Sequence, residues 1–325
     1  MSLGLSLRLE PDALQYDTLR CVHIEGICAV VPTPFKAGGE IDHDSLGRVV
    51  DLLVASGAHA LTALGAAVEV ARLGERERLD VVETIVGRVA GRRPVIVGAS
   101  YDGLRLCVEF SRAVKGMGAA AVMVAPPRLP RFQSEAVVNY YKSLAEAVDL
   151  PIVVHDYPLL CGFSMEAALL ARIARAVPAA RSIKLEDPPT PFKTARILAA
   201  AGTTRVSVLG GLGALFFLEE LMAGACGVMT GFAFPEVLVN VLALYRAERI
   251  EEAADLFYRF VPLMRFEFQE GIGMAIRKEL FRRRGALTDA STRAPSAMLD
   301  EGTRAALDRV LNWTVGQPGA AAILG

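Results

Sequence analysis

A lysine interrupts an apolar run at residues 182–185, and its position favours covalent chemistry. The run reads SIKL, and Ile183 and Leu185 on either side of Lys184 predict a largely buried strand. An amine that points into a protein interior loses hydration, which disfavours its protonated form and favours the nucleophile that condenses with a ketone. The competing interpretation is a lysine at the end of a strand whose side chain reaches the solvent.

Three further side chains could act on a ketone held by Lys184. Glu186 lies two residues along the same run and therefore faces the same side of the strand. His155 and Tyr157 stand in the segment HDYP at the end of another apolar run. A carboxylate and an imidazole can between them remove and deliver protons near neutral pH. We expect Glu186 to abstract a proton beside an imine and His155 or Tyr157 to protonate a leaving hydroxyl, although these residue types also allow the reverse assignment.

Eight short apolar runs, separated by longer amphipathic segments, must position these residues. They span 26–35, 58–64, 93–100, 119–127, 150–158, 181–187, 204–211 and 225–231. Runs that are apolar throughout are typical of parallel strands covered on both faces. Eight strand–helix units predict an α/β fold, a (β/α)8 TIM barrel, in which catalytic residues gather at the C-terminal ends of the strands. An open doubly wound sheet is the alternative, and the lack of a GxGxxG segment after the first run disfavours it.

The character of the sequence changes near residue 249. Three helical patterns at 250–270, 272–285 and 300–315 follow one another without an intervening strand, and no low-complexity linker separates them from the preceding units. We therefore expect an N-terminal arm at 1–22, the barrel at 23–248, and a C-terminal helical region at 249–325 that packs on the barrel.

Composition excludes several classes of partner. The 325 residues carry 35 Lys and Arg against 36 Asp and Glu, spread along the chain, so no surface for nucleic acid or an anionic membrane is indicated. The five cysteines form no CxxC pair and no histidine stands at metal-ligand spacing, so we expect a reduced, cytoplasmic setting and no metal site. The sequence also predicts no membrane span and no leader segment.

Four motifs follow predicted strands in a characteristic order: PTPF at 32–35, GAAVE at 65–69, HDYP at 155–158 and IKLED at 183–187. Together with the late segment KELFRRRGALTDASTRAPS at 278–296, they make the chain resemble the dihydrodipicolinate synthase and N-acetylneuraminate lyase superfamily from about residue 24 to about residue 311. The resemblance implies a Schiff base on Lys184, a small 2-keto acid substrate, no metal and no organic cofactor. It also implies a homo-oligomer, usually a tetramer built from dimers.

The chain departs from the best-known members of that superfamily at the substrate loops. Ala66 and Ala67 stand where two hydroxyl residues form a proton relay, although the backbone N–H groups of Gly65, Ala66 and Ala67 can still bind the substrate carboxylate. Leu160 stands near the arginine that holds a second carboxylate in dihydrodipicolinate synthase, and Arg128 in PPRLP replaces a pair of tyrosines near the site. These changes argue against dihydrodipicolinate synthesis.

The Lys-x-Glu pattern of Lys184 and Glu186 is similar to that of the superfamily members that dehydrate 2-keto-3-deoxy sugar acids. We therefore expect a hydro-lyase acting on such an acid, for example 2-keto-3-deoxyarabonate. The alternatives are a pyruvate-dependent aldolase or condensing lyase, and a barrel that binds a keto acid without chemistry. Thr33 and Gly211 are further candidates for substrate binding, and Glu69 is expected to support its own loop or a subunit contact.

Overall fold

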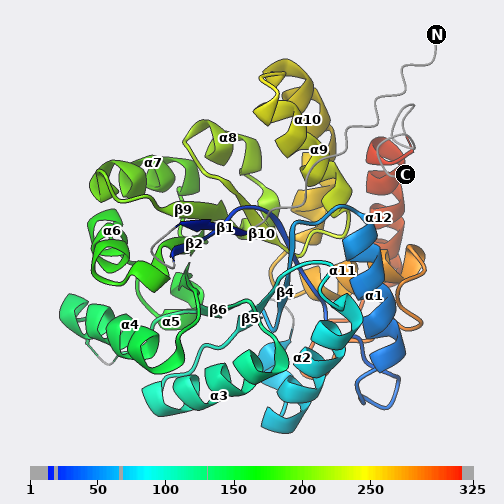
Figure 1. The fold of residues 1–325 in the computed structure, drawn as a ribbon. Coiled ribbons are helices and arrows are strands. Elements are labelled where there is room, and N and C mark those ends of the chain that lie inside the picture. The colour runs from blue at the N-terminus through cyan, green and yellow to red at the C-terminus, as the bar shows by residue number, and fades with distance from the viewer. Residues whose placement is uncertain (1–13, 18–20, 66–68, 130, 317–325) are drawn as a thin grey trace.

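The computed structural model describes residues 14–17, 21–65, 69–129 and 131–316, and it confirms the (β/α)8 barrel (Figure 1). Eight parallel strands close in the order β10-β3-β4-β5-β6-β7-β8-β9. They are β3 (Gly26–Val30), β4 (Ala60–Ala63), β5 (Val95–Gly98), β6 (Ala121–Val124), β7 (Ile152–Asp156), β8 (Ser182–Leu185), β9 (Ser207–Gly210) and β10 (Gly227–Thr230). Each lies within one of the eight predicted runs, although the first strand ends before PTPF begins.

A helix follows each barrel strand and covers its outer face. These helices are α1 (His43–Ala55), α2 (Glu75–Val89), α3 (Leu104–Met117), α4 (Ser134–Val148), α6 (Ala167–Ala176), α7 (Thr190–Ala201), α8 (Phe217–Met222) and α9 (Pro235–Arg246). Short turns of helix occur at α5 (Pro158–Cys161), η1 (Val70–Arg72), η2 (Pro178–Ala180) and η3 (Leu212–Ala214). Local signals fix several ends: the Asp42 side chain accepts the amide of Ser45 at the start of α1, and Gly118 ends α3 with a φ of 103°.

Alternate residues of each strand face the barrel interior. Ile183 and Leu185 of β8 pack in the large outer core between strands and helices, so Lys184 between them faces inward. A smaller interior core includes Cys28, Ile96 and Val153. Lys184 therefore faces the barrel interior, as the alternation of side chains along the strand predicts.

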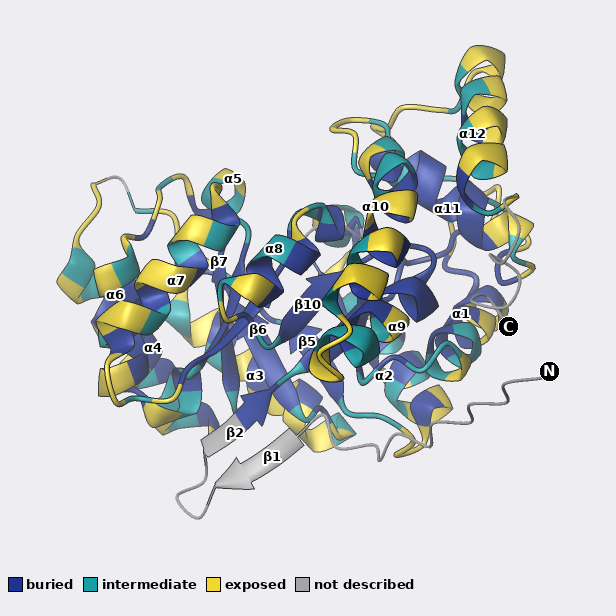
Figure 2. Ribbon diagram, turned by 90° about the horizontal axis from the view of Figure 1, so that it is seen from above, coloured by how far each residue is buried: buried dark blue, intermediate teal, exposed yellow. Residues whose placement is uncertain are grey.

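A two-stranded hairpin, β1 (Leu14–Asp17) and β2 (Cys21–Ile24), precedes the barrel strands, and the end of β2 lies at the end of the barrel opposite α5 (Figure 2). Its second strand enters the barrel, because Ile24 belongs to the interior core and its amide donates to Ser182 Oγ at 3.3 Å. The hairpin was not predicted, and it closes the N-terminal end, so the open end lies where the strands finish.

Three helices follow the barrel: α10 (Ile250–Glu267), α11 (Gly273–Arg283) and α12 (Glu301–Thr314). Helix α10 packs against α9 and α12 (Figure 1). The segment after α11 returns to the barrel, where Arg48 of α1 donates to the Ala286 carbonyl at 3.3 Å. No helix in the described part of the chain is long and apolar enough to cross a membrane.

Candidate active site

Lys184 lies inside the barrel near the C-terminal end of β8, and only 4% of its surface is exposed. Its backbone pairs with His155 of β7 on one side and Leu209 of β9 on the other. Because both neighbouring strands hold it, the lysine occupies a fixed position in a dry interior. The structure therefore excludes the competing interpretation of a lysine that reaches into bulk solvent.

Glu186 follows the same strand and contacts the lysine directly. Its Oε2 lies 3.0 Å from Lys184 Nζ, and its Oε1 accepts the amide of Leu212 at 3.1 Å. Burial acts to raise the pKa of Glu186, but the charge of Lys184 and the hydrogen bond from His155 outweigh burial and hold this pKa well below its usual range. The carboxylate is therefore ionised at neutral pH and available as a base.

His155 is fully buried beside this carboxylate. Its Nε2 lies 2.6 Å from Glu186 Oε2. Burial and the charge of Lys184 lower the pKa of His155, although Glu186 acts in the opposite direction. A neutral imidazole facing an ionised carboxylate donates from Nε2, so His155 orients Glu186 through a hydrogen bond.

Tyr157 continues from the end of β7 and stacks on His155, with ring centroids 5.5 Å apart and planes at 14°. Unlike His155, it lines a cavity of about 670 Å³ together with Glu186 and Leu212. Burial raises the pKa of the Tyr157 phenol, with a smaller contribution from Glu186, so the hydroxyl keeps its proton. Tyr157 is thus an acid that can reach a molecule in the cavity.

The backbone after β9 fits closely around Glu186. A Cβ atom at Gly211 would lie 2.2 Å from Glu186 Cγ, so only glycine fits there. Leu212, which donates to the carboxylate, has a φ of 44°, a left-handed conformation that costs a non-glycine residue roughly 1–2 kcal/mol. Gly211 therefore supports Glu186 by its lack of a side chain.

The remaining predicted residues lie in different places. Gly65 is buried with its α-carbon against Val30, Thr33 is buried and does not line the cavity, and Ala66 and Ala67 lie outside the described residues. The structure does not bring Arg128 to the cavity.

Arg128 forms its hydrogen bonds outside the cavity. Its amide donates to Asp102 at 3.0 Å and its Nε donates to the Leu160 carbonyl at 2.8 Å. The residue is exposed and lines a separate hollow beside Tyr101. Arg128 thus lines this hollow and not the cavity bordered by Glu186 and Tyr157, and its expected role in substrate binding stays a prediction.

A buried ion pair behind the site connects the two strand ends that carry it. Lys193 of α7 lies 2.5 Å from Asp156 Oδ2 and 2.6 Å from Asp187 Oδ2. Asp156 follows His155 and Asp187 follows Glu186, so Lys193 holds the ends of β7 and β8 together. Burial raises the pKa of Asp156 to about 6 despite this lysine.

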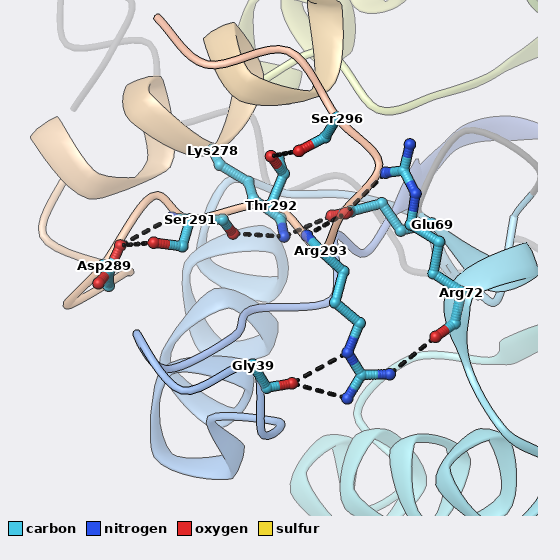
Figure 3. Close-up of polar contacts among 9 residues, drawn as sticks. All are labelled: Gly39, Glu69, Arg72, Lys278, Asp289, Ser291, Thr292, Arg293 and Ser296. Carbon is cyan, nitrogen blue, oxygen red and sulfur yellow. Dashed lines mark hydrogen bonds and ion pairs between the residues drawn. The ribbon is translucent and has the colours of Figure 1, made fainter.

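A second polar cluster borders the cavity and is drawn in Figure 3. Glu69, which lines the cavity, lies 2.5 Å from the Nζ of Lys278, a lysine with no exposed surface. The same carboxylate accepts from Arg72 at 2.9 Å and from the amide of Arg293 at 2.8 Å (Figure 3). Burial lowers the pKa of Lys278 to about 8. Glu69 therefore joins the start of η1 to α11 and to the segment that follows α11, and its expected role as a loop support or subunit contact stays a prediction.

Sequence reasoning missed the contribution of the C-terminal helices to the cavity. Arg277 and Met274 of α11, and residues 267–271 before it, line the cavity with Glu186. These residues lie far from Lys184 in the sequence, and no sequence pattern linked them to the site. Only the late segment beginning at Lys278, noted for its resemblance, pointed to this part of the chain.

Comparisons with known proteins agree with this architecture. The family model described as the dihydrodipicolinate synthetase family matches residues 23–313. The chain is 33% identical over 288 residues to the L-2-keto-3-deoxyarabonate dehydratase of Azospirillum brasilense, covering 87% of this chain and 92% of that protein. It is 28% identical over 302 residues to a 4-hydroxy-tetrahydrodipicolinate synthase of Porphyromonas gingivalis, covering 89% and 97%.

Among solved structures, the chain is similar to a dihydrodipicolinate synthase from Rhodopseudomonas palustris. The TM-score is 0.84 at 33% identity, over 89% of this chain and 97% of that one.

Proposed function

The chain belongs to the dihydrodipicolinate synthetase family and is therefore a lyase, and we propose that it dehydrates a 2-keto-3-deoxy sugar acid through an imine on Lys184. The observation that carries this proposal is the contact between Lys184 Nζ and Glu186 Oε2 at 3.0 Å inside the barrel. An ionised carboxylate at this distance can reach C3 of a 2-keto acid whose C2 is bound to the lysine nitrogen. It is thus a base next to the carbon that the imine acidifies.

The proposed reaction begins with attack of the Lys184 amine on the keto carbon, which releases one water and leaves a protonated imine. Glu186 removes a proton from C3, and the electron pair forms the C2–C3 double bond of an enamine. The C4–O bond then breaks, and the departing hydroxyl takes up a proton and leaves as water. Hydrolysis of the imine consumes one water and frees Lys184. When C5 is the terminal carbon and carries a hydroxyl group, as in a pentonate, the unsaturated product tautomerises through an enol to a semialdehyde.

We assign the acid that protonates the leaving hydroxyl to Tyr157. The phenol lines the cavity and keeps its proton, whereas the Nε2 of His155 is already hydrogen-bonded to Glu186. Neither His155 nor Lys184 is among the residues that line the cavity, so Glu186 and Tyr157 are the members of this group that border it. His155 then acts as a positioning residue that orients Glu186 through the 2.6 Å hydrogen bond. We also propose that the backbone N–H groups of Gly65, Ala66 and Ala67 bind the substrate carboxylate. Ala66 and Ala67 lie outside the described residues.

A second candidate is a lyase that condenses or releases pyruvate through the same imine. It is favoured by the similarity to proteins named 4-hydroxy-tetrahydrodipicolinate synthase. The alanines at 66 and 67 disfavour it, because the hydroxyl relay that the resemblance associates with condensation is missing from the sequence. The similarity to the L-2-keto-3-deoxyarabonate dehydratase supports dehydration.

The test is mass spectrometry after borohydride reduction, with pyruvate and a panel of 2-keto-3-deoxy acids as separate substrates. We expect a reduced adduct on the peptide that contains Lys184, and for the active sugar acid an adduct lighter by one water than the simple reduced imine. The Lys184→Met variant should give no adduct and no turnover. A pyruvyl mass from the sugar acid would favour aldol cleavage, and an unmodified Lys184 would overturn the imine for both candidates.

A further inference from the structure

Arg277 reaches the cavity from the C-terminal helices and is held there by a buried partner. It lies on α11, is 4% exposed, and lines the same cavity as Glu186 and Tyr157. Its Nε donates to Glu267 Oε1 at 2.6 Å, and the other oxygen of Glu267 accepts the amide of Ala233 at 3.0 Å. The side chain is therefore fixed in one orientation before any ligand arrives.

The guanidinium group of Arg277 lies directly over the end of β10. A Cβ atom at Gly231 would be 2.7 Å from one of its terminal nitrogens, so the glycine makes room for it. Only the Nε of Arg277 has a hydrogen-bond partner among the residues that the structure describes. The four N–H donors on the two terminal nitrogens are thus available to a molecule in the cavity.

A neighbouring arginine shows that this arrangement is not a general feature of the region. Arg284, which follows α11, pairs with Glu236 at 2.7 Å and also donates to the Ala233 carbonyl through its other terminal nitrogen. It does not line the cavity. Arg284 uses its donors inside the protein, whereas Arg277 keeps them for the cavity.

The charges around the cavity indicate what kind of group these donors bind. Carboxyl groups on the described lining come from Glu69, Glu186, Asp187, Glu267 and Glu270. Both lining guanidinium groups are already paired, Arg72 with Glu69 at 2.9 Å and Arg277 with Glu267 at 2.6 Å. Lys278, Lys184 and Lys193 pair with Glu69, Glu186 and Asp187, so among the described residues Glu270 is the lining carboxyl without a cation partner. A second carboxylate on the substrate would face this remaining negative charge, whereas a hydroxyl group accepts a hydrogen bond without adding charge.

We propose that Arg277 is a specificity-determining residue that donates hydrogen bonds to a hydroxyl group on the substrate tail, beyond the carbon that loses water. The cavity then accepts monocarboxylic sugar acids with a neutral hydroxylated tail and rejects those with a carboxylate at the far end. This inference rests on the proposed function, because it needs a keto acid anchored on Lys184.

The test is a competition assay in which borohydride traps pyruvate on Lys184 while a second acid competes for the site. Pyruvate has no tail, so Arg277→Met should leave the pyruvate concentration needed for trapping unchanged. The same variant should weaken competition by a 2-keto-3-deoxypentonate by about 10- to 100-fold, the effect of losing a hydrogen bond from a charged donor. With the intact protein, a 2-keto-3-deoxy acid of equal length with a terminal carboxylate should compete more weakly than the hydroxylated acid.

Two controls address folding. Arg284→Met removes a similar buried arginine outside the cavity and should leave competition by both acids unchanged. The double variant Glu267→Gln with Arg277→Met avoids leaving a buried carboxylate without its partner, and it should reproduce the loss seen in the single variant. The comparison of the two acids on the intact protein needs no variant to fold.

The outcomes separate this inference from the proposed function. Equal competition before and after Arg277→Met, a parallel loss of pyruvate trapping, or preference for the dicarboxylic acid would overturn the role of Arg277. Because competition does not need turnover, a protein that binds the hydroxylated acid through Arg277 without dehydrating it would overturn the proposed dehydration alone.

Discussion

Glu186 is held by backbone that approaches it too closely for any side chain at residue 211. We expect Gly211→Ala to displace the carboxylate, because the new Cβ would lie 2.2 Å from Glu186 Cγ. A shift of this kind should lower the rate of dehydration by about 100-fold, while pyruvate trapping on Lys184 is retained. Steady-state kinetics and borohydride trapping measure the two effects.

The control for this variant is Gly116→Ala in α3, where a Cβ meets no atom within 4 Å. It should leave the rate unchanged and raise stability slightly, since alanine is favoured over glycine inside a helix. Full activity in Gly211→Ala would show that the position of Glu186 is not critical.

His155 offers a second test at the scale of the residue, because it can act by orienting Glu186 or by giving up a proton. Glutamine can donate a hydrogen bond to Glu186 but cannot serve as an acid, so we expect His155→Gln to keep the rate within about tenfold of the native protein and His155→Leu to lose about 100-fold. Burial and the charge of Lys184 lower the pKa of His155, so the neutral imidazole predominates at the pH where an ordinary histidine is half protonated.

The pH profile of kcat/KM should therefore show no loss near pH 6.5 in the native protein. Equal losses in the glutamine and leucine variants, with an ionisation near neutral pH that disappears in both, would instead identify His155 as the acid.

At the scale of the element, the sequence predicted the barrel strands well because their signal is local. Each strand is a run of β-branched and apolar residues covered on both faces, and the inward parity of Lys184 follows from Ile183 and Leu185 alone. The hairpin β1–β2 carried no such signal: its residues up to 22 were assigned to an N-terminal arm, and only its last two residues, His23 and Ile24, to the barrel. The boundaries proposed at residues 22 and 248 stay predictions.

Helix α8 places a carboxyl group where water does not reach, and this gives a prediction for stability. Glu220 has no exposed surface and its carboxyl lies against the α-carbon of Gly210. Burial raises the pKa of Glu220 from 4.5 to about 7, which the hydroxyl of Thr190 offsets only in part. Between these pH values the folded state binds more protons than the unfolded state, so stability falls as pH rises from about 4.5 and the loss is complete above 7.

The loss amounts to about 3 kcal/mol for this shift. We expect Glu220→Gln to remove it, so that the variant is more stable than the native protein at pH 8 and similar at pH 5. Urea unfolding at several pH values measures this, with Glu251→Gln, an exposed carboxyl on α10, as the control that should keep the native slope. A native slope in Glu220→Gln would contradict the prediction.

At the scale of the whole molecule, the C-terminal helices complete the site, and no local pattern could have shown this. Phe35 of the PTPF motif contacts two cations from that region: Lys278 Nζ lies 4.2 Å and Arg293 Cζ 4.5 Å from its ring centroid. Two motifs that supported the family resemblance are therefore packed together, although they lie at opposite ends of the chain. Contacts between such distant segments form only when the barrel closes, so no local sequence pattern predicts them.

The cluster around Glu69 in Figure 3 should make the barrel and the C-terminal helices unfold as one unit. Lys278→Met leaves Glu69 with Arg72 and the amide of Arg293, so we expect a loss of about 1–3 kcal/mol. Glu69→Ala leaves the buried ammonium of Lys278 with the Ser291 carbonyl at 2.9 Å as its hydrogen-bond acceptor, and should cost about 3–5 kcal/mol.

Urea unfolding, followed by circular dichroism and by the fluorescence of Trp313 in α12, tests both the order of these losses and the cooperativity. Coincident transitions are expected in the native protein, because α11 carries Lys278 and α12 packs on α10. In the double variant the loss of stability should be smaller than the sum of the two single losses. Both the Glu69 carboxylate and the Lys278 ammonium are then absent, so neither charge is buried without its partner. Additive losses, or a fluorescence transition at lower urea than the circular dichroism transition, would show that the helices are attached to the barrel without this coupling.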